Sequence, residues 1–293
     1  MDRHRSSLPK PGACLLSILL VFAGILAGSR AAAESPGLDE LAGLGVADAF
    51  TIRSTVLERD LHVYVRTPLE YEREGDPLPT VYLLDGGILF PMLAPLQLMM
   101  EIDGLAPEAL VVGISYGGIG YSNGNLRGTD YTVPSGTVDY YGGAAAYQRF
   151  LVEEVFPRVE ARFRSDPARR VILGQSLGGQ FVLFNALTRP ELFHGHVAVN
   201  PAIHEVLPWF LDAPAPEKPA RSANLIVTRA EHEPARLAEP LSQWLGTRGE
   251  ELRADLDLHV VELSGQYHAS SAPRAYRAAM RRLFDLPAGP GGD

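Results

Sequence analysis

The sequence RVILGQSLGGQFVLFNALTRP at residues 170–190 indicates the fold most clearly. It opens with a short apolar run, passes through GQSLG at 174–178, and continues into an apolar segment with helical spacing. A Gly-x-Ser-x-Gly motif between a strand and a helix is typical of a nucleophile elbow, a tight turn that exposes a serine hydroxyl. The helix should end before Pro190, because the residue preceding a proline disfavours helical geometry.

The same motif occurs twice more, as GISYG at 113–117 and GYSNG at 120–124. Ser122 has no apolar run before it. Ser115 follows such a run, but the glycine-rich sequence after it is a poor helix start. Only Ser176 has both a strand before it and a helix after it, so the sequence predicts Ser176 as the nucleophile.

On either side of this elbow, short apolar runs alternate with helical segments. We expect strands at 50–56, 61–67, 80–84, 109–116, 171–174, 196–199, 225–228 and 258–263, and helices at 91–102, 144–163, 179–188, 234–245 and 273–286. This alternation predicts an α/β fold, with a mostly parallel central sheet, helices on both faces and an antiparallel pair formed by the first two strands. The short connection between the sixth and seventh strands argues against a large lid domain.

A serine hydroxyl becomes a good nucleophile only beside a base that is itself oriented by an acid. In this fold the acid and then the histidine follow the serine along the chain. His268 comes directly after the last expected strand, where open α/β sheets place their sites. The acid should follow the seventh strand. There Glu233 is the preferred residue and Glu231 the alternative.

The same reasoning predicts donors for a developing oxyanion. One is the backbone N–H of Leu177, the residue after the nucleophile. The other should come from the turn after the third strand, where the chain reads LDGGI at 84–88. Gly87 is the preferred donor and Gly86 is close behind it.

Composition and charge limit the classes of protein to which the chain can belong. The chain has 293 residues, of which 46% are hydrophobic and 21% charged, which suits one large globular domain over residues 34–293. Its net charge of −9 argues against a general nucleic-acid binder, because phosphate neutralisation needs a basic face. We expect no metal site, because no histidine–carboxylate cluster has ligand spacing.

The first 33 residues have the layout of a secretory signal peptide. A basic start containing Arg3, Arg5 and Lys10 precedes an apolar run and the sequence AAA at 31–33. The apolar run is roughly 16 residues long, below the ~20 that span a bilayer. We therefore expect a periplasmic or secreted protein without a stable membrane anchor. Cleavage would also remove Cys14, the only cysteine, which excludes disulfides from the mature chain.

Three segments together resemble the esterase D-like family of α/β-hydrolases, with the siderophore-esterase type most similar. They are YLLDG at 82–86, VVGI at 111–114 followed by RGTDYTVP at 127–134, and GQSLGG at 174–179. The resemblance spans roughly residues 50–286 and implies a carboxylic-ester hydrolase without a cofactor. The chain departs from the family pattern at Ala230, where a glycine is frequent, and at Asn200-Pro201-Ala202, where Ser-Pro-Ser is common. Its Thr–Pro spacing at 132–134 is one residue longer.

These observations lead us to expect hydrolysis of a small-molecule ester through an acyl-enzyme. Acyl transfer by the same residues, or a non-catalytic hydrolase fold used for binding, are the alternatives. Arg127 and Tyr121 lie in a glycine- and tyrosine-rich loop and are candidate substrate contacts. Arg127 has a second interpretation, which we prefer, as the partner of Asp130 in bracing that loop. The sequence does not indicate the oligomeric state.

Overall fold

A computed structural model describes residues 46–118, 124–214 and 223–286. Two sequence-based predictions, the signal peptide at 1–33 and the substrate contact Tyr121, lie outside these residues, as does Ser122. Within the described ranges the chain forms an eight-stranded sheet with the order β1-β2-β4-β3-β5-β6-β7-β8. The strands are β1 Val46–Ser54, β2 Arg59–Thr67, β3 Leu78–Leu83, β4 Leu110–Ser115, β5 Ser165–Gln175, β6 Gly195–Val199, β7 Asn224–His232 and β8 Leu258–Tyr267.

The sheet is mostly parallel, as predicted. β2 runs antiparallel to both β1 and β4, and every other neighbouring pair is parallel. Parallel strands end at the same edge, so the turns after β3, β4, β5, β6, β7 and β8 meet there. The residues predicted for the site follow these strands, and the topology therefore gathers them at one edge of the sheet.

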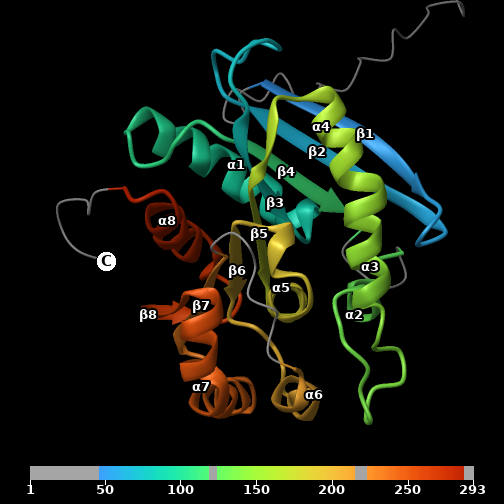
Figure 1. The fold of residues 1–293 in the computed structure, drawn as a ribbon, viewed down its shortest axis with the longest axis vertical. Coiled ribbons are helices and arrows are strands. Elements are labelled where there is room, and N and C mark those ends of the chain that lie inside the picture. Colours follow the sequence, from blue (N-terminus) through green and yellow to red (C-terminus); the bar gives the residue numbers. More distant parts are fainter. Residues whose placement is uncertain (1–45, 119–123, 215–222, 287–293) are drawn as a thin grey trace, which may run out of the picture. The chain divides into compact units, whose positions relative to one another are not determined.

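Helices cover both faces of the sheet (Figure 1). The helices are α1 Gly86–Ile102, α2 Arg127–Asp130, α3 Ala144–Phe150, α4 Phe156–Arg162, α5 Leu177–Thr188, α6 Leu207–Asp212, α7 Ala235–Leu256 and α8 Ala272–Leu283. Alternate residues of one strand face opposite sides. In β5, Val171 and Leu173 pack with α1 and α8, whereas Ile172 packs with the helices of the other face. This confirms the predicted α/β class.

Several boundaries differ from the prediction. The helix expected at 144–163 is interrupted by a π-helical turn at Leu151–Val155, which separates α3 from α4. Helix α1 begins at Gly86, five residues earlier than expected from the start at residue 91, because the Asp85 carbonyl accepts the Ile88 and Leu89 N–H groups. Helix α7 continues to Leu256, beyond the predicted end at residue 245. The prediction stopped too early because polar residues dominate the sequence after residue 245 and make the apolar face of the helix hard to recognise.

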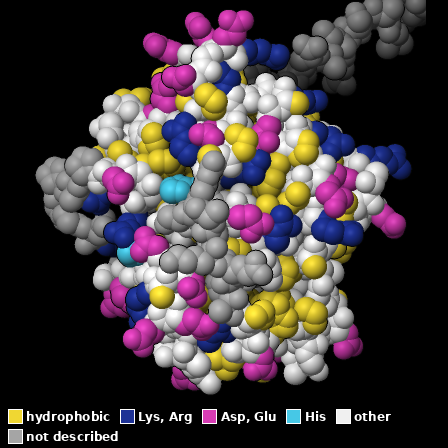
Figure 2. Space-filling view, viewed as in Figure 1, with side chains coloured by type: hydrophobic (Ala, Val, Ile, Leu, Met, Phe, Trp, Pro, Cys, Tyr) yellow, Lys and Arg dark blue, Asp and Glu magenta, His cyan; other side chains and the backbone are white. Residues whose placement is uncertain are grey.

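The surface carries charges of both signs. Figure 2 shows Lys and Arg interspersed with Asp and Glu over one face, without a continuous basic stripe. Between β6 and β7 the described residues contain one short helix, α6. None of the described helices combines the length and apolar character that crossing a bilayer requires.

Candidate active site

Ser176 occupies a strained turn between β5 and α5. Its φ of 60° and ψ of −117° lie outside the regions that a serine normally adopts. Three backbone bonds hold the turn: Ser176 N–H donates to the Val199 carbonyl at 2.9 Å, and the Ser176 carbonyl accepts from Gln180 at 3.0 Å and Ala202 at 3.1 Å. An outlier that its surroundings enforce in this way is a feature of functional sites.

Two glycines of the elbow, Gly174 and Gly179, are required by close backbone approach. A Cβ on Gly174 would lie 2.4 Å from the Gly178 carbonyl oxygen. A Cβ on Gly179 would lie 2.9 Å from Pro201 Cα. The sequence therefore places glycine where the strand, the turn and the first helical turn pack too tightly for a side chain.

The structure brings His268 to Glu233. His268 follows β8 directly, and its Nδ1 lies 2.6 Å from Glu233 Oε1. The His268 side chain is 24% exposed and that of Glu233 only 8%. Glu231, the alternative acid, instead accepts the Gly265 N–H at 2.7 Å. Residue 231 belongs to β7 and residue 233 lies beyond its end, so the strand directs the two carboxylates to different neighbours.

A network around the backbone of His268 was not predicted from the sequence. The His268 carbonyl accepts hydrogen bonds from the side chains of Gln175 and Asn200, the latter at 3.2 Å. In the sequence, Asn200 stands out only as a departure from the family pattern. The signal that could have found it is its place directly after β6, next to the elbow.

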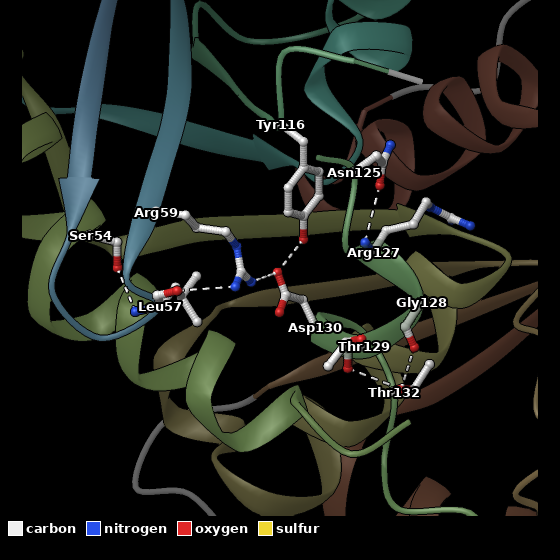
Figure 3. Close-up of polar contacts among 10 residues, drawn as sticks. All are labelled: Ser54, Leu57, Arg59, Tyr116, Asn125, Arg127, Gly128, Thr129, Asp130 and Thr132. Carbon is white, nitrogen blue, oxygen red and sulfur yellow. Dashed lines mark hydrogen bonds and ion pairs between the residues drawn. The ribbon is translucent and has the colours of Figure 1, made fainter. Parts of the chain in front are cut away.

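Arg127 pairs with Asp85, so the predicted Arg127–Asp130 pair is wrong. Arg127 Nε and Nη2 donate to the two carboxylate oxygens of Asp85 at 2.8 and 2.9 Å. Arg127 Nη2 also donates to the Gln175 carbonyl at 3.3 Å. Figure 3 shows the reason: Arg127 extends away from Asp130, although both belong to α2. Arg127 thus ties the turn after β3 to the end of β5.

Asp130 has partners on the opposite side (Figure 3). It accepts hydrogen bonds from Arg59 and from the Tyr116 hydroxyl, the latter at 2.7 Å. Burial raises the pKa of Tyr116, so the phenol stays protonated and can donate this bond. The loop is therefore braced at two ends, through Asp85 and through Asp130.

The predicted oxyanion donors lie in the first turns of two helices. Leu177 is the first residue of α5 and Gly87 the second residue of α1. The first N–H groups of a helix have no intrahelical acceptor, and the helix dipole makes this end favourable for negative charge. Leu177 and Gly87 thus hold positions at which a helix leaves its N–H groups without an intrahelical acceptor.

A cleft of about 350 Å³ contains two of the three candidate catalytic side chains. Ser176 and His268 line it together with Arg127. A second cavity of about 200 Å³ adjoins it and contains Gly87. The two share the lining residues Asp85, Ile88 and Asn125. The residues described by the structure include no group of three or more His, Cys, Asp or Glu that could hold a metal ion.

Comparison with known proteins matches the chain to esterases. A family model described as "Putative esterase" matches residues 54–238. The chain is 28% identical to the ferri-bacillibactin esterase BesA of Bacillus subtilis, over 81% of this chain and 92% of that protein. It is 31% identical to the siderophore triacetylfusarinine C esterase of Aspergillus fumigatus, over 48% of this chain and 51% of that one.

Solved structures share the fold. The siderophore hydrolase EstB from Aspergillus nidulans matches with a TM-score of 0.70 and 22% identity, over 83% of this chain and 96% of that chain. An IroE-like serine hydrolase from Shewanella oneidensis matches with a TM-score of 0.68 and 18% identity, over 82% of this chain and 80% of that chain. The chain therefore belongs to this esterase family of the α/β-hydrolases and is a carboxylic-ester hydrolase.

Proposed function

We propose that the protein is an exported serine esterase that hydrolyses siderophore-type esters through Ser176, His268 and Glu233. The observation that carries the proposal is the position of Ser176 on a strained elbow in the same cleft as His268, whose Nδ1 lies 2.6 Å from Glu233. Nucleophile, base and orienting acid are the arrangement that ester cleavage needs.

In acylation, Ser176 Oγ forms a bond to the ester carbonyl carbon as His268 Nε2 takes the hydroxyl proton. Glu233 holds the ring in the tautomer with its proton on Nδ1 and stabilises the imidazolium that forms. The carbonyl oxygen becomes an oxyanion that the Leu177 and Gly87 N–H groups bind. The bond to the leaving oxygen then breaks, and His268 returns its proton to that alkoxide.

Deacylation repeats these steps with water. His268 removes a proton from water as the hydroxide oxygen attacks the acyl carbon, and the Ser176 oxygen leaves and takes up that proton. The products are an alcohol and a carboxylic acid. Losing one oxyanion donor is worth about 10²–10³-fold in kcat, so both backbone donors matter to the rate.

Two observations support the substrate class. The first is the names of its relatives. The ferri-bacillibactin esterase matches 81% of the chain, and the siderophore triacetylfusarinine C esterase matches 48% of it. The cleft adjoins a second cavity lined by Tyr64 and Tyr116, and Ile88 lines both, so a bulky ester could occupy the two together. Arg127 lines the cleft while it holds Asp85, and we propose that it also contacts the polar part of the substrate.

A panel of esters tests this function. The protein and its Ser176→Ala variant are incubated with p-nitrophenyl acetate, a feruloyl ester and a ferric trilactone siderophore, and the products are identified by mass spectrometry. We expect Ser176-dependent opening of the trilactone with a higher kcat/KM than for the feruloyl ester. Ester products only in the presence of an added alcohol would indicate acyl transfer. Binding of the siderophore without cleavage would indicate a non-catalytic role.

We also propose export of the protein to the periplasm or medium, on the basis of the basic, apolar and small-residue segments within residues 1–33. Expression of the full chain followed by fractionation and N-terminal sequencing tests it. The expected mature start lies just after the AAA at 31–33. A cytoplasmic protein that keeps its first residues would contradict the proposal.

A further inference from the structure

Asn200 lies between the end of β6 and the turn that contains His268, which we call the histidine turn. It directly follows β6, its backbone is left-handed with φ of 42°, and it is 1% exposed. Asparagine tolerates this conformation better than most residues. Its N–H donates to the Thr228 carbonyl at 3.2 Å, which fixes its backbone to β7.

The Asn200 amide uses both its donor and its acceptor. Its Oδ1 accepts from the Thr228 hydroxyl at 3.1 Å, and its Nδ2 donates to Ser271 Oγ at 2.6 Å and to the His268 carbonyl at 3.2 Å. A carbonyl oxygen can only accept, so this contact requires the amide nitrogen to face His268. Only one orientation of the Asn200 amide group therefore forms all three hydrogen bonds.

The histidine turn depends on such bonds for its position. His268 lies in the turn between β8 and α8, and its ring is held by Glu233 at Nδ1. The backbone carbonyl is the second point of attachment. Gln175, at the end of β5, and Asn200, at the end of β6, both donate to it. Gln175 directly precedes Ser176. Asn200 follows β6, the strand next to β5.

We infer that Asn200 is a positioning residue that sets the distance of the His268 ring from Ser176 by holding the His268 carbonyl. This inference rests on the proposed function, since it assigns a role relative to the proposed base. A misplacement of about 1 Å between reacting groups can cost 10²-fold in rate. Asn200 does not line the cleft of Ser176, so its effect should fall on kcat rather than on KM.

The test uses Asn200→Asp, which keeps the shape and the acceptor facing Thr228 but replaces the donor with an oxygen. Asn185→Asp is the matched control. Asn185 is likewise buried, donates to the Phe181 carbonyl at 2.9 Å and accepts from Gln148 at 2.9 Å, but lies within α5, away from the cleft. Both variants place an oxygen against a backbone carbonyl, so both lose stability. Only Asn200→Asp should change catalysis.

We expect kcat for p-nitrophenyl acetate to fall roughly ten- to hundredfold in Asn200→Asp, with KM unchanged. The downfield proton resonance of the His268 Nδ1–H should shift or broaden in this variant and persist in Asn185→Asp. If Asn200→Asp does not fold, Asn200→Gly is measured in the same way, because glycine accepts the positive φ and removes the donor.

Wild-type kcat in a folded Asn200 variant, or equal losses in the Asn185 control, would overturn the inference. Ser176→Ala measured in parallel separates the two claims. If that variant stays active, the proposed function fails. If it is inactive while the Asn200 variants keep wild-type kcat, only the positioning role fails.

Discussion

Two strands of this sheet end in the same five-residue motif, yet they end differently. GISYG closes β4 and GQSLG closes β5. Ser115 is the last residue of β4, is 4% exposed, and its Oγ accepts the Gly117 N–H at 3.1 Å. Ser176 lies one residue beyond β5, at φ of 60°, and opens a twelve-residue helix, α5.

The difference shows what the motif needs from its surroundings. After β5 a helix starts at once, and its first turn packs on Pro201 and on the strand. After β4, the described residues 116–118 form no helix. A serine between glycines forms an elbow where a helix follows the strand directly and packs against it. Without such a helix, the serine remains the last residue of its strand, as Ser115 does.

The greatest change should come from removing the Ser176 hydroxyl, with removal of the Ser115 hydroxyl as the comparison. Ser176→Ala should lower kcat for p-nitrophenyl acetate by about 10³-fold or more, because the attacking oxygen is lost. Ser115→Ala should stay close to wild type, because the Ser115 hydroxyl caps its own loop. Initial rates of both purified variants check this. Similar losses in the two variants would remove the distinction between the motifs.

The two glutamates around the end of β7, Glu231 and Glu233, give the next largest effect. Glu233→Gln should lower kcat by about 10²–10⁴-fold, because a neutral amide cannot stabilise the imidazolium and can impose the wrong tautomer. Glu231→Gln changes only a bond to the Gly265 backbone and should keep kcat. Steady-state kinetics of the pair decide the assignment, and a larger loss in the Glu231 variant would reverse it.

Close packing at the β5 motif predicts a stability effect. Gly174→Ala should destabilise the fold by about 1–3 kcal/mol, because its Cβ would lie 2.4 Å from the Gly178 carbonyl oxygen, which cannot move freely. Gly136→Ala is the control, since apart from Gly136 and its two chain neighbours no atom lies within 4 Å of the position that its new methyl group would take. Urea unfolding of both variants measures the difference. A Gly174 variant as stable as the control would contradict tight packing at the elbow.

A weaker effect concerns β6, the strand beside β5. Burial lowers the pKa of His196 from 6.5 to about 3. The unfolded chain therefore binds a proton that the folded chain does not, and stability should fall as pH drops from about 6.5 toward 3. The slope from this residue is at most about 1.4 kcal/mol per pH unit. His196→Leu should flatten it in urea unfolding across this range, and an unchanged slope would show that another group causes the acid sensitivity.

Features of the fold that depend on local pattern can be predicted from the sequence. The apolar run before Ser176 and the helix period after it indicate the strand, the turn and the helix, and the alternation of such segments indicates the parallel sheet. The predicted start of α1 is too late because the true start depends on the left-handed backbone of Asp85, which an Asp-Gly-Gly sequence does not reveal.

Contacts between distant segments are harder to predict. Arg127 and Asp130 have a spacing that suits a pair on one helix, but α2 has only four residues and directs them to different strands. Glu231 and Glu233 can be separated only once the end of β7 is known. Asn200 stands out in the sequence only by its place after β6 and as a departure from the family pattern, because its contact with the carbonyl of His268 joins segments far apart in the chain.

Active-site labelling tests the assignment of the nucleophile. The full chain, Ser176→Ala and Ser115→Ala are treated with a fluorophosphonate, digested and mapped by mass spectrometry. We predict a single adduct on Ser176 in the first and third proteins and none in the second. An adduct on Ser115, or no adduct in folded protein, would contradict the role of Ser176 as the nucleophile.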